Sequence, residues 1–157
     1  MPPMKTPRFP APMRAASVLV CLCVLTPVAP GQSPSPGAAD RKMLVGEWQG
    51  AIMGADGSKH MDLSLSIGEN KIKSSGGRGH QRDGEGTYRI SGGTPKLWHI
   101  DGTGTAGLYR GKSYLGVLSI EGDTLKWCSA EPGRTRPTAL KSDARYSHYL
   151  MVLTREK

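Results

Sequence analysis

The chain has 157 residues, which is enough for one domain and little else. Its 21 Lys and Arg residues exceed its 13 Asp and Glu residues, for a formal net charge of +8. The basic residues do not cluster, since the longest basic run is Arg41-Lys42, and aromatic residues do not alternate with them as in a single-strand binding platform. We therefore expect an ordinary charged surface and no nucleic-acid partner.

Residues 1–31 have the pattern of a secretory signal peptide. A basic segment precedes an apolar run over residues 15–25, which is about half the roughly 20 residues that a membrane-spanning helix needs. The small residues Ala29 and Gly31 have the spacing usual for a cleavage site, so we expect the mature chain to begin near Gln32. The predicted location is periplasmic or extracellular, with no integral membrane segment after cleavage; an uncleaved anchor is the alternative.

The segment after the predicted signal peptide, residues 32–39, is rich in Pro, Ser and Gly and is predicted to be a disordered linker. Of the three cysteines, Cys21 and Cys23 lie in the signal peptide, so only Cys128 remains in the mature chain. An intramolecular disulfide is thereby excluded. The domain over residues 40–157 must be stabilised by its core alone.

The mature domain reads as eight strands after a short helical turn capped by Asp40. Alternation of apolar and polar residues is clearest over residues 61–67. Strands are expected at residues 45–53, 61–67, 71–73, 86–90, 96–100, 112–120, 123–128 and 147–154. Turns are expected at residues 55–58, 68–70, 101–104 and 121–122, and polar loops at residues 74–84 and 130–146. The pattern predicts an all-β fold, an antiparallel up-and-down barrel or a strongly curled sheet.

Short motifs along this domain carry a family resemblance. They are LVGEW at residues 44–48, GVL at 116–118, GDTL at 122–125, Cys128, AEPG at 130–133, RP at 136–137 and VLTREK at 152–157. In these motifs the chain resembles the small exported β-domains that occur in many copies in planctomycete bacteria. The resemblance covers most of residues 40–157 and is densest in the last third. It implies a lipocalin-like fold but no particular molecular function.

The residues Gly46, Glu47 and Trp48 also resemble the Gly-x-Trp motif of lipocalins. In that family an arginine from the end of the last strand lies over the indole, and Arg155 is the matching residue here. In a closed barrel of eight strands, the first and last strands are antiparallel neighbours, so the start of one lies beside the end of the other. We therefore expect Arg155 to cover Trp48 and close one end of the barrel, a cation–π contact worth about 0.5–2 kcal/mol.

Residues that could carry catalysis or bind a metal are present but form no recognisable pattern. The potential metal ligands, none at the short spacing of zinc sites, are His60, His80, His99, His148 and Cys128. Cys128 could form a nucleophile pair with a histidine, but beside Trp127 in a strand it is better explained as a small buried side chain. We expect no cofactor, no metal and no enzymatic activity; a hydrolase or metal enzyme is the remaining alternative.

The predicted function is binding of a small apolar or amphipathic ligand in the open mouth of a monomeric barrel. The wall candidates, chosen by residue type and by position in the strands, are Trp98, Tyr109, Tyr114 and Trp127. The alternative is a cell-envelope interaction module with a filled barrel, whose loops 74–84 and 130–146 bind a protein or a polysaccharide. A hollow or a packed interior distinguishes the two.

Overall fold

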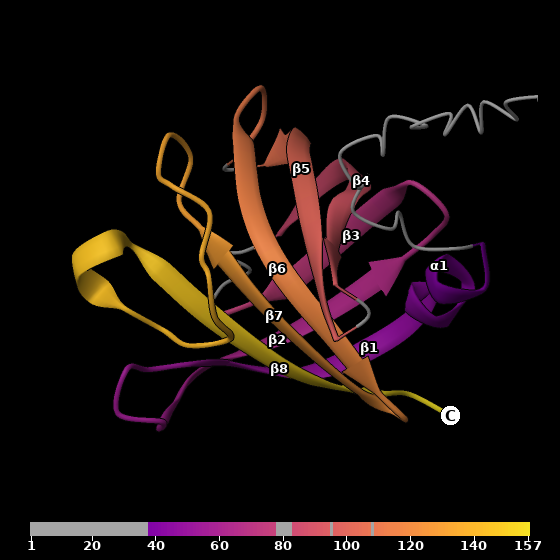
Figure 1. The fold of residues 1–157 in the computed structure, drawn as a ribbon, viewed down its shortest axis with the longest axis horizontal. Coiled ribbons are helices and arrows are strands. Elements are labelled where there is room, and N and C mark those ends of the chain that lie inside the picture. Colours follow the sequence, from indigo (N-terminus) through magenta and orange to yellow (C-terminus); the bar gives the residue numbers. More distant parts are fainter. Residues whose placement is uncertain (1–37, 78–82, 95, 108) are drawn as a thin grey trace, which may run out of the picture. The chain divides into compact units, whose positions relative to one another are not determined.

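The computed structural model describes residues 38–157, except residues 78–82, 95 and 108. The predicted signal peptide and most of the predicted linker lie outside the described residues. Eight strands form a closed barrel in which each strand is antiparallel to its neighbours and the last strand pairs with the first (Figure 1). The predicted up-and-down antiparallel barrel is confirmed.

The elements follow one another around the barrel in sequence order. They are α1 (Ala38–Leu44), β1 (Gly46–Met53), β2 (Lys59–Ile67), β3 (Lys71–Gly76), β4 (Gly84–Thr94), β5 (Leu97–Gly107), β6 (Ser113–Glu121), β7 (Thr124–Ala130), η2 (Ala144–Tyr146) and β8 (His148–Arg155). Helix α1 begins at Ala38, before the predicted cap Asp40, so residues 38 and 39 belong to the helix and not to a disordered linker. Within the described part of the chain, no helix has the length and hydrophobicity to span a membrane.

Strand β5 differs most from its prediction, because it continues through the turn expected at residues 101–104 and ends at Gly107. Gly102 and Gly104 suggested a turn, but both lie in the strand. A side chain at either position would point into the barrel interior. A Cβ atom added at Gly102 would overlap the ring of Tyr114 on β6. The glycine therefore marks a close approach of a neighbouring side chain, a common meaning of glycine within a strand.

One end of the barrel, which we call the closed end, is sealed where the first and last strands meet. Trp48 and Arg155 are register partners across β1 and β8, and the guanidinium carbon of Arg155 lies 4.2 Å from the centroid of the Trp48 ring. The guanidinium also donates hydrogen bonds to the carbonyl oxygens of Val45, at 2.8 Å, and of Met43. Trp48 Nε1 donates to the carbonyl oxygen of Leu44 at 2.9 Å. Helix α1 is thereby tied to the last strand.

The half of the barrel next to the closed end is filled with large side chains. Each strand contributes at least one buried residue to this packing: Trp48, Ile67, Ile72, Tyr88, Ile100, Leu118, Leu125 and Leu153. Tyr88 satisfies its hydroxyl by donating to the carbonyl oxygen of Gly68 at 2.7 Å. Burial of one such side chain contributes roughly 1.5–3 kcal/mol, so this half supplies much of the hydrophobic stabilisation of the domain.

The loop between β7 and β8, residues 131–147, packs against the outer face of the barrel. Ser142 Oγ donates to the carbonyl oxygen of Met53 at 2.7 Å and accepts from the Leu150 amide at 2.8 Å. The Cys128 thiol, fully buried beneath the loop, donates to the carbonyl oxygen of Lys141 at 3.2 Å. The loop therefore holds β1, β7 and β8 together, and Cys128 has the role of a small buried side chain there.

Arg136 attaches the same loop to β5 and β6, the strands that follow β7 on the side away from β8. Its guanidinium donates to the carbonyl oxygens of Ile100, at 3.1 Å, and of Gly116, at 2.7 Å, and pairs with the carboxylate of Asp101. Partial burial alone would raise the pKa of Asp101, but the hydrogen bond and charge of Arg136, helped by Arg89, bring it below its ordinary value. The carboxylate is therefore ionised and pairs with Arg136 at neutral pH.

The closure at Trp48 and Arg155 predicts coupled losses of stability. Trp48→Ala is expected to lower the free energy of unfolding by about 3–5 kcal/mol, because it empties a buried aromatic position, and Arg155→Ala by about 1–2 kcal/mol. The double variant should show a coupling energy above about 0.5 kcal/mol in urea unfolding. Lys157→Ala, at an exposed position near the chain end, is the control and should change little. Strictly additive losses would show that the two side chains do not act together.

Candidate functional site

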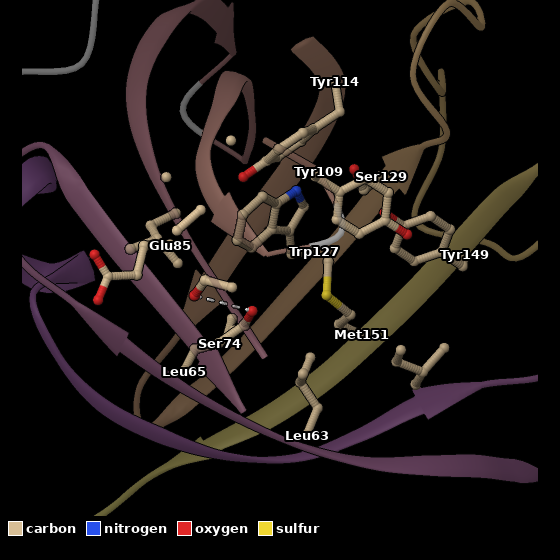
Figure 2. Close-up of a pocket in the computed structure, with 16 residues that line it drawn as sticks. Leu63, Leu65, Ser74, Glu85, Tyr109, Tyr114, Trp127, Ser129, Tyr149 and Met151 are labelled. Carbon is tan, nitrogen blue, oxygen red and sulfur yellow. Dashed lines mark hydrogen bonds between the residues drawn. The ribbon is translucent and has the colours of Figure 1, made fainter. Parts of the chain in front are cut away.

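The half of the barrel away from the closed end is hollow. It encloses a cavity of about 80 Å³, counted as the volume open to the centres of water-sized molecules, and the cavity is partly open to solvent (Figure 2). For scale, an engineered apolar cavity of about 150 Å³ in another protein binds benzene. The cavity thus has room for a small molecule of a few heavy atoms, or for one end of a longer ligand that continues outward.

The hollow arises because the inner faces of several strands carry small residues in this half. The small residues at the cavity wall are Ser74, Gly84, Gly86, Gly104, Ala106 and Ser129. Strands β3, β4 and β5 carry Ile72, Tyr88 and Ile100 toward the closed end. The remaining apolar wall is formed by Ile52, Leu63, Leu65, Ile72 and Met151. One barrel therefore has a packed half and a hollow half.

The structure brings together three of the four aromatic residues chosen from the sequence. Tyr109, Tyr114 and Trp127 line the cavity, with ring centroids 6.3 Å apart for the two tyrosines and 6.4 Å apart for Tyr114 and Trp127. Trp98 does not line it. That residue pairs with Leu118 near the closed end and packs against the core. Residue type and strand placement could not show at which end of a strand an inward side chain would lie.

Several of the other wall residues could have been found from the sequence but were not chosen. Tyr149 and Met151 lie on β8, and Ser129 follows Trp127 by two residues on β7. Since side chains in a strand alternate between faces, the period of two was the signal that could have found them. The inward face of β8 was visible in the alternation of Tyr149, Met151 and Leu153.

The ring of Tyr114 is positioned by glycines on the two strands beyond its own. It lies across Gly102 of β5, and its hydroxyl oxygen is 3.3 Å from the position of a Cβ atom built on Gly86 of β4. Burial, and then the neighbouring Tyr109, raise the pKa of the Tyr114 hydroxyl above its ordinary value. The hydroxyl is therefore protonated at neutral pH and available as a neutral donor and acceptor at the wall.

Tyr109 reaches the cavity from the segment between β5 and β6, which folds back onto β5. The Gly104 amide donates to the carbonyl oxygen of Lys112 at 3.0 Å, and the Gly111 amide donates to the carbonyl oxygen of Gly104 at 2.8 Å. Gly111 has a φ of 74°, a value that glycine adopts without steric cost. This folded-back segment places the Tyr109 ring at the outer part of the cavity.

Trp127 presents a buried hydrogen-bond donor without an acceptor. The residue is 3% exposed, and its Nε1 is the one buried side-chain nitrogen or oxygen in the described residues that has no hydrogen-bond partner. A Cβ atom on Gly116 of the adjacent strand would lie 2.6 Å from this nitrogen, so only glycine leaves room for it. Figure 2 shows the indole nitrogen on the edge of the ring that faces Tyr114. Buried Trp N–H groups usually have a partner, so this donor distinguishes the site.

Charged residues contribute little to the cavity. Among the described residues that line it, Glu85 is the single charged one, and its exposed side chain pairs with Lys73 at 3.1 Å. In the described ranges no group of three or more His, Cys, Asp or Glu side chains is placed to hold a metal ion; His80 lies outside them. The chemistry offered by the wall is apolar contact together with neutral donors.

Comparison of the chain with protein-family models, with curated proteins and with solved structures finds no match. The resemblance to the planctomycete domains therefore stays a prediction. The function of the cavity has to be argued from its geometry.

The close packing of Tyr114 on Gly102 predicts that a single methyl group is destabilising there. Gly102→Ala is expected to lower the free energy of unfolding by about 1–3 kcal/mol, because the Cβ atom overlaps the Tyr114 ring. Chemical denaturation and near-UV circular dichroism measure the loss and the displaced ring. The matched control is Gly68→Ala, where the nearest atom to a new Cβ is 3.7 Å away; it should stay within about 0.5 kcal/mol of the parent. Equal stability of the two variants would refute the packing argument.

Proposed function

We propose that this protein is a non-enzymatic binding protein that holds a small apolar or amphipathic ligand in the hollow half of its barrel. The observation that carries the proposal is an apolar cavity into whose wall a buried, unpartnered indole N–H is built at Trp127. Small-molecule sites in proteins have this composition, mostly apolar lining with a few placed polar groups.

The framework around the cavity supports binding without large rearrangement. The closed end is held by the contact between Trp48 and Arg155, and the 131–147 loop is hydrogen-bonded to β1 through Ser142 and to β6 through Arg136. A preformed cavity loses little conformational freedom when a ligand enters, so more of the contact energy appears as affinity.

We also propose that the domain acts outside the cytoplasm, as the predicted signal peptide implies, and as a monomer. The fold is compatible with export in one respect, because the described part of the chain folds without forming a disulfide. Cys128 is the single cysteine of the described chain, it is buried, and burial raises the pKa of its thiol. A neutral, buried thiol is unreactive in an oxidising compartment.

Filling the cavity should abolish binding without unfolding the barrel. We expect 2-hexanone, a small amphipathic probe, to shift the NMR resonances of the cavity residues in the parent protein. Ala106→Leu adds three carbons to a small wall residue on β5 and is expected to weaken binding of the probe by at least about tenfold, or 1.4 kcal/mol.

The matched control for this experiment is Thr105→Leu, the same new side chain on the neighbouring, exposed position of β5. Its affinity for 2-hexanone should equal that of the parent. If the probe shifts no cavity resonance up to its solubility limit, or if both variants bind it equally, the proposed function is wrong.

A second candidate function, a polysaccharide-binding surface on the 131–147 loop, is favoured by an exposed aromatic group. Tyr146 is 56% exposed, its ring stacks on His148 with centroids 5.7 Å apart, and the guanidinium of Arg145 lies 5.8 Å from its centroid. Surface loops held on a rigid scaffold often carry binding residues. Residues 78–82 of the other predicted binding loop, residues 74–84, lie outside the described residues.

This candidate is tested by affinity electrophoresis in gels that contain a soluble polysaccharide such as xylan. Tyr146→Ala should remove any retardation of the parent protein, because it removes the exposed ring, whereas Tyr146→Phe should keep it. Identical mobility of parent and Tyr146→Ala in gels with and without polysaccharide would remove this candidate.

A further inference from the structure

The hydrogen-bond donor at Trp127 has no acceptor among the described residues. Its indole is 3% exposed and its nitrogen lies over Gly116. The carbonyl oxygen of Gly116 accepts a hydrogen bond from Arg136 at 2.7 Å. A buried donor left unpaired carries the desolvation penalty of the group without the compensating hydrogen bond. Any occupant that offers an acceptor at this point therefore gains more than its apolar contact alone.

An indole N–H is a donor only, so the matching group must be an acceptor. Five hydroxyl-bearing residues of the described chain belong to the same wall, and two of them, Tyr114 and Ser129, lie on strands β6 and β7. The Tyr114 hydroxyl is protonated at neutral pH, and Ser129 Oγ, in a residue that is 1% exposed, has a hydrogen bond to the Ala130 carbonyl oxygen at the long distance of 3.4 Å. Tyr114 lies on β6, and Ser129 and Trp127 lie on the neighbouring strand β7. The indole N–H and these two hydroxyls are thus contributed by two adjacent strands.

The charge of the matching group follows from what surrounds it. No Lys, Arg or His is found among the described residues that line the cavity, and the exposed carboxylate of Glu85 pairs with Lys73. A carboxylate buried without a cation carries a large desolvation cost. The apolar side chains of Ile52, Leu63 and Met151 complete the wall. An uncharged oxygen beside a short aliphatic group fits this wall best.

We propose that Trp127 Nε1–H donates a hydrogen bond to a neutral oxygen of the ligand, so that the cavity selects uncharged carbonyl, ester or hydroxyl compounds with a short apolar chain over both hydrocarbons and carboxylates. This inference rests on the proposed function, because it names the ligand class of the same cavity. Trp127 is the specificity-determining residue, and Gly116 is the residue that makes room for its nitrogen.

Three probes of matched shape test the inference. They are 2-hexanone, 2-methyl-1-hexene, in which a CH₂ group replaces the carbonyl oxygen, and pentanoate, in which an oxygen replaces the methyl group beside the carbonyl. Dissociation constants are measured by NMR titration at neutral pH for the parent protein and for Trp127→Phe. Comparing the ketone with the alkene in both proteins cancels their different hydration, in the manner of a double-mutant cycle.

The preference for 2-hexanone over 2-methyl-1-hexene is expected to fall by roughly two- to tenfold in Trp127→Phe, the range of one hydrogen bond. In the parent, 2-hexanone should move the Trp127 indole N–H resonance downfield while the alkene does not, and this readout holds even if Trp127→Phe fails to fold. The Trp48 indole, bonded to the Leu44 carbonyl oxygen at 2.9 Å, is the internal standard and should not respond. Pentanoate should bind at least about tenfold more weakly than 2-hexanone.

The outcomes separate this inference from the proposed function. If the ketone and the alkene both bind, but the indole resonance and the preference ratio do not respond to the carbonyl, the cavity is a ligand site and the hydrogen bond is refuted. If pentanoate binds as tightly as 2-hexanone, the neutral ligand class is refuted. If none of the three probes binds, the proposed function itself fails.

Discussion

The contact between Trp48 and Arg155 is the constraint on which the rest of the structure depends. It joins the first strand to the last at 4.2 Å, and the same guanidinium binds the carbonyl oxygens of Val45 and Met43. Closure at this seam removes both free edges of the sheet, which would otherwise be sites of non-specific pairing. Because the seam also anchors α1, the closed end is covered and the large side chains beside it are buried.

A firmly packed half allows the other half to be hollow. A cavity costs stability because its wall atoms lose contacts, and the buried N–H of Trp127 adds a further cost. The filled half and the 131–147 loop, with Ser142 bonded to β1 and β8 and Arg136 bonded to β5 and β6, supply the stability that offsets these costs. Features that are unfavourable for folding and persist in a structure commonly mark functional positions.

Glycines set the shape of the hollow half in two different ways. Gly84 and Gly86 line the cavity directly, whereas Gly102 and Gly116 lie beneath the ring of Tyr114 and the nitrogen of Trp127. The first pair leaves space for a ligand, and the second pair leaves space for the aromatic residues that would contact it. Glycine thus shapes the wall both by leaving open space and by leaving room for a neighbouring aromatic side chain.

The sequence by itself determined the all-β fold and the antiparallel order of its strands, because alternation with a period of two is local and the neighbours in an up-and-down arrangement follow from chain order. It left open whether the sheet closes into a barrel or only curls, and the tertiary structure decided for the closed barrel. Three of the wall candidates that the sequence suggested, Tyr109, Tyr114 and Trp127, line one cavity in the structure. Only the tertiary structure decided that Trp98 lies toward the filled half, that Gly102 continues β5, and that the nitrogen of Trp127 lacks an acceptor. These facts depend on how far each strand is staggered against the next and on which side chains meet across the interior, and neither is encoded in the spacing of residues along one strand.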